Sequence, residues 1–225
     1  MLPAFYRFVS DQIIDWQPEI VCLTGDIVDK THCIEWIDDC FSRLAAPAGC
    51  YFILGNHDDR VADPEQVRQR MQSLGWTDVG GKVCVTSYRE TKLLIAGNER
   101  PWFGSLPALD NEELDTADEA TTFRLLLSHS PDQIEWARKQ RVQLMLAGHT
   151  HGGHGRLPLV GPLLSPSHYG SRFASGEFYL SPTTMHVTRG LFGTHMQRIR
   201  CRPELSLLNL RQAVSDDASP ILPSA

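Results

Sequence analysis

Apolar and polar positions along this chain of 225 residues follow two periods, one typical of helices and one typical of strands. The expected helices cover residues 4–16, 34–44, 63–74 and 131–140. The expected strands cover residues 19–24, 50–54, 83–88, 92–96, 123–127, 142–147, 177–180, 184–188 and 205–210. Asp63-Pro64 is typical of a helix start, with Asp as the N-cap and Pro in the first turn. Strands that alternate with helices predict an α/β fold.

Four of the apolar strands run directly into residues that bind metals or transfer protons. These strand ends read Gly25-Asp26, Gly55-Asn56-His57-Asp58, Ser128-His129 and Gly148-His149-Thr150-His151. Ligands of open α/β sheets bind beyond the carboxyl ends of the strands, so the four ends are expected to form one pocket. The alternative is a set of unrelated loop residues, since Gly, Asn and Asp are common in turns. A fourfold repetition of the same construction favours the pocket.

The residues at these strand ends form a nitrogen and oxygen ligand set that contains no thiolate. A carboxylate, an amide oxygen and imidazoles suit manganese, iron, zinc or cobalt better than calcium or magnesium. Such sites can hold two metal ions, bridge a phosphate and generate hydroxide near neutral pH. A histidine that is not a ligand could then protonate the leaving oxygen.

Composition narrows the class of protein. The length fits a single domain over residues 1–211, and the Ser-, Asp- and Pro-rich residues 212–225 are expected to be a disordered tail. A net charge of −6 argues against specific nucleic-acid binding. The six cysteines form no C-x-x-C pair, and no apolar run is long enough to span a bilayer. We therefore expect a cytoplasmic protein, with membrane association only if a further segment lies upstream.

The four motifs, in this order and at this wide spacing, resemble those of the calcineurin-like metallophosphoesterase family. The phrases over residues 23–29 and 149–153 look like the bacterial phosphodiesterase branch, and the resemblance covers residues 5–211. It implies a four-layer α/β/β/α sandwich of two mixed sheets. It also implies a phosphate-ester substrate and hydrolysis, most simply of a phosphodiester, by a metal-activated water at a dinuclear site.

The resemblance assigns a role to each motif residue. Asp26 would bridge two metals, and His151 would belong to the first metal site. The second site would be completed by Asn56, His129 and His149. His57 would act on the leaving group of the substrate, and Asp58 would orient His57.

One departure from the family pattern changes these expectations. The family begins with a strand that ends in Asp-x-His, and no Asp-x-His occurs in this sequence. The first strand of the fold is therefore expected to be missing, either because the true start lies upstream or because the chain is a shortened form. Asp29 and His32 lie just beyond Asp26, but nothing in the sequence assigns them to the first site.

Three consequences follow from this departure. The resemblance implies two divalent metals, whereas this chain is expected to bind about one tightly. A non-catalytic or weakly active metal-binding scaffold of the same fold stays open as the alternative function. An unpaired strand would also leave an open sheet edge, through which we expect self-association.

Overall fold

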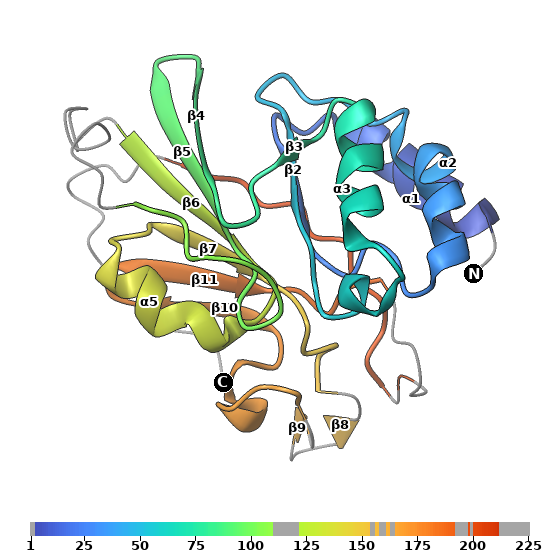
Figure 1. The fold of residues 1–225 in the computed structure, drawn as a ribbon. Helices are drawn as coiled ribbons and strands as arrows, with labels where there is room; N and C mark the ends of the chain where they lie inside the picture. The colour runs from blue at the N-terminus through green and yellow to red at the C-terminus, as the bar shows by residue number, and fades with distance from the viewer. Residues whose placement is uncertain are drawn as a thin grey trace.

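The computed structural model describes residues 3–109, 122–153, 156–157, 161–162, 165–191, 198 and 200–211 (Figure 1). The helical elements are α1 (Pro3–Trp16), η1 (Thr31–Trp36), α2 (Ile37–Phe41), η2 (Asp58–Arg60), α3 (Pro64–Ser73), η4 (Pro131–Gln133), α5 (Ile134–Lys139) and η5 (Gly170–Phe173). The first strands are β1 (Val21–Thr24), β2 (Cys50–Ile53), β3 (Thr77–Asp78), β4 (Val83–Tyr88), β5 (Thr91–Asn98) and β6 (Thr122–Ser128). The remaining strands are β7 (Leu144–Ala147), β8 (Arg156–Leu157), β9 (Gly161–Pro162), β10 (Gly176–Leu180) and β11 (Thr183–Val187).

The strands form two main sheets. The first has the order β1-β2-β3 and is parallel, and the second has the order β10-β11-β7-β6-β5-β4. In the second sheet β5, β6, β7 and β11 are parallel, whereas β4 and β10 pair antiparallel at the two edges. A small hairpin of β8 and β9 projects below both sheets in Figure 1.

Alternate residues of each central strand enter different cores, because successive side chains of a strand point to opposite faces. Tyr51 and Ile53 of β2 pack between the two sheets, together with Leu125 and Leu127 of β6. Phe52, which lies between the first two, packs instead beneath the helices α2 and α3. A third core joins the outer face of the six-stranded sheet to α5. The order of layers is therefore α/β/β/α, and the fold class expected from the sequence is confirmed (Figure 1).

Most of the predicted elements are present. The helix expected over residues 131–140 begins as the 3₁₀ turn η4 before α5, and two other elements differ more. The helix start at Asp63 is confirmed, since the Asp63 carboxylate accepts the backbone N–H of Glu65 at 3.1 Å. The single helix expected over residues 34–44 is instead the 3₁₀ turn η1 followed by the short α2. The prediction of a strand over residues 205–210 was wrong, because residues 201–211 pair with no strand in the described part of the chain. That segment is held by isolated contacts, such as the backbone bond from Glu204 N–H to the Gly190 carbonyl.

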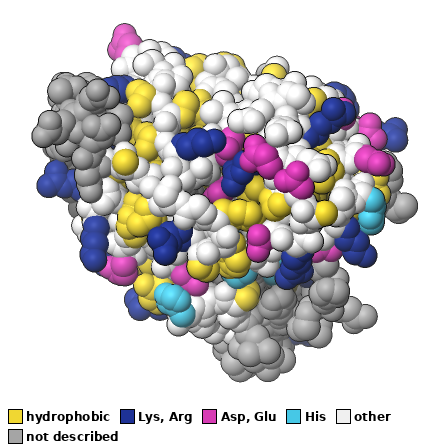
Figure 2. Space-filling view, viewed as in Figure 1, with side chains coloured by type: hydrophobic (Ala, Val, Ile, Leu, Met, Phe, Trp, Pro, Cys, Tyr) yellow, Lys and Arg dark blue, Asp and Glu magenta, His cyan; other side chains and the backbone are white. Residues whose placement is uncertain are grey.

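Several expectations from the sequence are not tested by the described residues. Residues 212–225 lie outside the described residues, so the predicted tail stays a prediction. Within the described part of the chain, β1 pairs on one side only, with β2, and self-association through its other edge also stays a prediction. None of the described helices combines the length and the apolarity needed to cross a bilayer. On the face in Figure 2, acidic and basic side chains are interspersed.

Candidate metal centre

The carboxyl ends of four strands meet where the two sheets come together. Asp26 follows β1 and Asn56 follows β2, both from the three-stranded sheet. His129 follows β6 and His149 follows β7, both from the six-stranded sheet. One ligand atom each from Asp26, His129 and His149 lies within 4.8 Å of the other two. The pocket expected from the strand ends therefore gathers these three side chains from both sheets.

The hydrogen bonds of His129 leave a nitrogen lone pair that faces other lone pairs. Its Nδ1 lies 2.7 Å from the Thr24 carbonyl oxygen and donates to it, so the neutral ring carries its lone pair on Nε2. Nε2 lies 2.9 Å from Oδ1 of Asn56 and 3.3 Å from Oδ1 of Asp26. Nδ1 of His149 lies 3.2 Å from the same Nε2. Four nitrogen and oxygen atoms that can each supply a lone pair thus converge in a half-buried place, which a cation among them would stabilise. The donor set thus fits a divalent transition metal.

Burial keeps both histidines of this group in the form that binds metals. It lowers the pKa of His129, against the opposing effect of the Asp26 carboxylate. It lowers the pKa of His149 to about 4, with His129 acting in the same direction. Both rings are therefore neutral near pH 7, which is the protonation state that an imidazole ligand requires.

The backbone around the group is constrained. Asp26 and His149 have positive φ angles of 57° and 68°, a conformation that is uncommon outside glycine and that clusters at functional sites. Gly25 allows the close approach of the neighbouring loops, because a Cβ on it would lie 2.6 Å from Nδ1 of His129. A Cβ on Gly55 would collide with the Asp26 carboxylate and the His129 ring. The glycines of these motifs are thus explained by close packing around the ligands.

Asp58 holds together two of the loops that carry ligands. Its carboxylate is fully buried and accepts N–H groups from Gly55 at 2.8 Å, Val28 at 2.8 Å and Ile27 at 3.2 Å. Burial raises the pKa of Asp58, and these three donors oppose that shift by stabilising the carboxylate. The contacts of Asp58 therefore favour a role in fixing the Asp26 and Asn56 loops, not the role of orienting His57 that the resemblance implies.

His57 is instead paired with a residue that the sequence left without a role. Nδ1 of His57 lies 2.5 Å from Oδ1 of Asp29, and Nε2 lies 4.0 Å from Oδ2 of Asp26. Arg60 lies beside this pair, with its guanidinium 3.6 Å from the Asp29 carboxylate. The one signal for Asp29 in the sequence was its place in the same loop as Asp26. His32, the other candidate there, packs its ring on Trp36.

Two further side chains border the group. His151 has a φ of 50° and is close enough to His149 to contribute to lowering its pKa, but it lies outside the group of three ligand atoms. Trp102 packs its indole against the rings of both His129 and His149, and sequence reasoning missed it because it belongs to no motif. His154 lies outside the described residues.

A half-buried cluster of nitrogen and oxygen donors lies at the strand ends of an α/β/β/α sandwich, with a histidine–carboxylate pair beside it, as expected of a metal-dependent hydrolase. A family model described as Calcineurin-like phosphoesterase matches residues 2–153. The chain belongs to this family and is a metal-dependent phosphoesterase.

Individual proteins agree with this assignment. Phosphodiesterase YaeI of Escherichia coli is 31% identical over 90% of this chain and 75% of its own length. The metallophosphoesterase YkuE of Bacillus subtilis is 29% identical over 87% of this chain and 68% of its own length. The solved structure of the Haemophilus influenzae NAD nucleotidase shares the fold, with a TM-score of 0.50 over 84% of this chain and 43% of that protein, at 15% identity.

Proposed function

We propose that this chain hydrolyses phosphodiesters at the centre formed by Asp26, His129 and His149. The observation that carries the proposal is the convergence of these ligand atoms within 4.8 Å beside the His57–Asp29 pair. The name of the 31% identical relative, a phosphodiesterase, supports a diester over a monoester as the substrate. A diester hydrolase needs both a place for the phosphate and a proton for the leaving oxygen, and the site offers both.

Four side chains would hold the tightly bound metal in this proposal: Asp26, Asn56, His129 and His149. Asp26 could also reach a second metal, with His151 as the other candidate ligand. A bound divalent ion supplies Lewis acidity and lowers the pKa of water, which provides a nucleophile at neutral pH. With two candidate ligands against four, the second ion is expected to bind more weakly.

His57 is proposed as the group that protonates the leaving oxygen. Its Nδ1–H donates to Asp29, which fixes the ring so that Nε2 faces the Asp26 side of the centre. We propose Asp29, in preference to Asp58, as the residue that orients His57.

The alternative is a scaffold of the same fold that binds one metal and turns over substrate weakly or not at all. It is favoured by one observation, namely that His151 lies outside the group of three ligand atoms among the described residues. The retained His57–Asp29 pair argues against it, because metal binding alone does not require that pair.

Hydrolysis of bis(p-nitrophenyl) phosphate by purified protein tests the two functions. The protein is stripped with a chelator and reloaded with Mn²⁺, and Asp26→Asn is measured beside the wild type. We expect metal-dependent diesterase activity in the wild type and its loss in Asp26→Asn, because the amide cannot supply the anionic ligand. Metal binding without diesterase activity in the wild type would establish the scaffold instead.

A further inference from the structure

Trp102 contacts both histidine ligands at once. Its ring centroid lies 5.0 Å from that of His129, in an edge-to-face arrangement, and 4.8 Å from that of His149. The two histidine rings are themselves 4.9 Å apart, so the three rings pack as a triangle. Aromatic pairs in this range of distance and angle attract one another beyond the effect of burial alone.

The two histidines differ in how their orientation is fixed. A histidine ligand normally donates its second ring N–H to a carbonyl or carboxylate, which sets its tautomer and its angle. His129 does so, through Nδ1 and the Thr24 carbonyl. His149 has no such partner among the described residues, and its Nδ1 lies 3.2 Å from Nε2 of His129. Among the described residues, ring contacts with Trp102 and with His129 are therefore what can hold the His149 ring in place.

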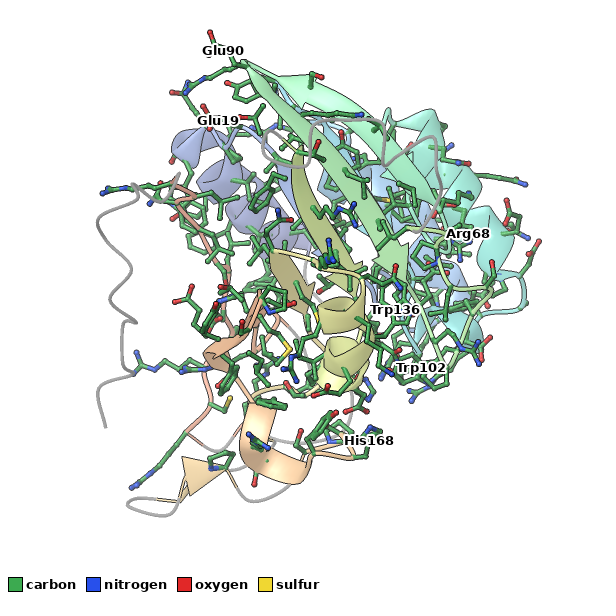
Figure 3. All side chains as sticks on the ribbon, turned by 90° about the vertical axis from the view of Figure 1, so that its left-hand side faces the viewer. Glu19, Arg68, Glu90, Trp102, Trp136 and His168 are labelled. Carbon is green, nitrogen blue, oxygen red and sulfur yellow. The ribbon has the colours of Figure 1, made fainter. Side chains whose placement is uncertain are left out.

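The segment that carries Trp102 is attached to the Asn56 side of the centre through Glu99. The Glu99 carboxylate is buried, accepts the Leu54 N–H at 2.6 Å and binds the guanidinium of Arg68 at 2.6 Å. The Glu99 carbonyl accepts the backbone N–H groups of Trp102 and Phe103 at 3.1 and 3.2 Å. Trp102 and Arg68 lie on the same side of the molecule in Figure 3.

The same segment is attached to the His129 side through Asn98. The Asn98 side chain is buried, accepts the Arg100 N–H at 3.1 Å and donates to the Gln133 side chain at 3.3 Å. Gln133, four residues after His129, donates in turn to the Arg100 carbonyl at 3.4 Å. The backbone that carries the indole is thus fixed from both halves of the centre, as a support for the ligand rings requires.

We propose that Trp102 is a positioning residue of the metal centre, which fixes the His149 imidazole by packing against it and against His129. The inference rests on the proposed metal-dependent function and adds a residue to that site. It predicts that the loss of the aromatic ring weakens metal binding, although Trp102 offers no ligand atom. It also predicts that a bound paramagnetic or coloured ion quenches the fluorescence of this tryptophan in particular.

The test is a Co²⁺ titration of the chelator-stripped chain, followed by tryptophan fluorescence and by competition with a chromophoric chelator. The variants are Trp102→Phe, which keeps a ring, and Trp102→Ala, which removes it. Trp136→Phe, on α5 and packed against the outer core of the six-stranded sheet, is the matched control. We expect quenching in the wild type and in Trp136→Phe, and loss of most of the quenching in Trp102→Phe.

The affinities separate positioning from a merely structural role. Trp102→Ala should bind Co²⁺ roughly 10–100-fold more weakly, as for other partners of metal ligands, while Trp102→Phe stays near the wild type. The visible spectrum of bound Co²⁺ should change in Trp102→Ala, since it reports the geometry of the ligands. Unchanged affinity and an unchanged spectrum in Trp102→Ala would overturn the proposal, as would equal quenching in Trp102→Phe and wild type. A wild type that binds no Co²⁺ would instead overturn the proposed function, and the role of Trp102 with it.

Discussion

His57 and His149 lie in one site but have different partners. We therefore expect their substitutions to have different effects on turnover and on metal content. His149 belongs to the ligand group, whereas His57 pairs with Asp29 and faces the centre with its other nitrogen. His57→Ala should lower turnover by roughly 10²–10⁴-fold and leave the metal content unchanged, because it removes only a proton donor. His149→Ala should lose the metal. Elemental analysis beside steady-state kinetics measures both, and equal metal loss in the two variants would make His57 a ligand.

The dependence on the leaving group gives an independent check of the same role. A leaving group of low pKa departs without protonation, so the effect of His57→Ala should shrink along a series of diesters with increasingly acidic leaving groups. A defect of constant size across the series would contradict proton donation by His57.

Asp29 is expected to act through His57. Asp29→Asn should lower turnover roughly tenfold or more, since the amide fixes the tautomer and the orientation of His57 less well than the carboxylate does. In the His57→Ala background the same substitution should have almost no effect, because residues that act as a unit are not additive. Asp59→Asn is the matched control, since Asp59 is an exposed aspartate of the neighbouring loop. Additive losses in the double variant would assign Asp29 a separate role.

At this scale the sequence indicated the candidate ligands better than the residues that support them. The sequence predicted both the chemistry and the location of four side chains, because each follows an apolar strand within a motif: Asp26, Asn56, His129 and His149. Asp29 and Trp102 have ordinary neighbours in the sequence, and only the fold brings them to the rings of His57 and His149. The role implied for Asp58 illustrates the same limit, because its three backbone partners become visible only when two loops meet.

Helix α3 carries two arginines that pair with acids in different environments. Arg68 binds Asp78 at 2.7 Å and Glu99 at 2.6 Å, and both carboxylates are almost fully buried. Arg68→Met should lower the free energy of unfolding by about 3–5 kcal/mol, because it removes the guanidinium from the buried Glu99 carboxylate, whereas Asp78 keeps Lys82. Arg70 pairs with Asp38 at the surface, and Arg70→Met should cost about 0–1 kcal/mol.

Chemical denaturation of the two variants beside the wild type measures this difference. Because Glu99 also binds the Leu54 N–H next to the Asn56 loop, Arg68→Met should in addition weaken metal binding. Similar stabilities for the Arg68 and Arg70 variants would show that the buried network does not stabilise the junction of the two sheets.

Helices and strands with a regular hydrophobic period could be predicted from the sequence, whereas segments held by tertiary contacts could not. The β4–β5 hairpin and α3 follow local patterns, and they appear where the patterns predicted them. The leucines over residues 205–210 look like a strand, but that segment finds no strand to pair with. Periodicity reports which face of a segment is apolar, while strand pairing depends on neighbours distant in the sequence.

The proposed ligands come from both sheets of the molecule, so metal binding should stabilise the fold. Asp26 and Asn56 come from one sheet, and His129 and His149 come from the other. An ion that binds only the folded chain adds about 2.7 kcal/mol at a free concentration of 100 times its Kd. Thermal unfolding with Mn²⁺ and with chelator should therefore differ by several degrees in the wild type, and the difference should vanish in His149→Ala. A metal-dependent shift that persists in His149→Ala would place the stabilising ion elsewhere.

The layers of the molecule followed from the sequence, but the order of the strands did not. Alternation of strands and helices predicted the α/β class, and the motif resemblance implied two stacked sheets. The sheet order β10-β11-β7-β6-β5-β4 depends on crossovers between distant segments, which no local pattern records. The position of the site was nevertheless predictable, because strand carboxyl ends gather at one edge whatever the strand order.

The central claim is that a metal held by Asp26, Asn56, His129 and His149 enables phosphodiester hydrolysis. The most direct measurement is a stoichiometric titration of the stripped protein with Mn²⁺, in which bound metal and hydrolysis of bis(p-nitrophenyl) phosphate are followed on the same samples. The account predicts about one tightly bound equivalent, no activity without metal, and activity that rises only as metal binds. Diester hydrolysis that persists in the metal-free protein would contradict it.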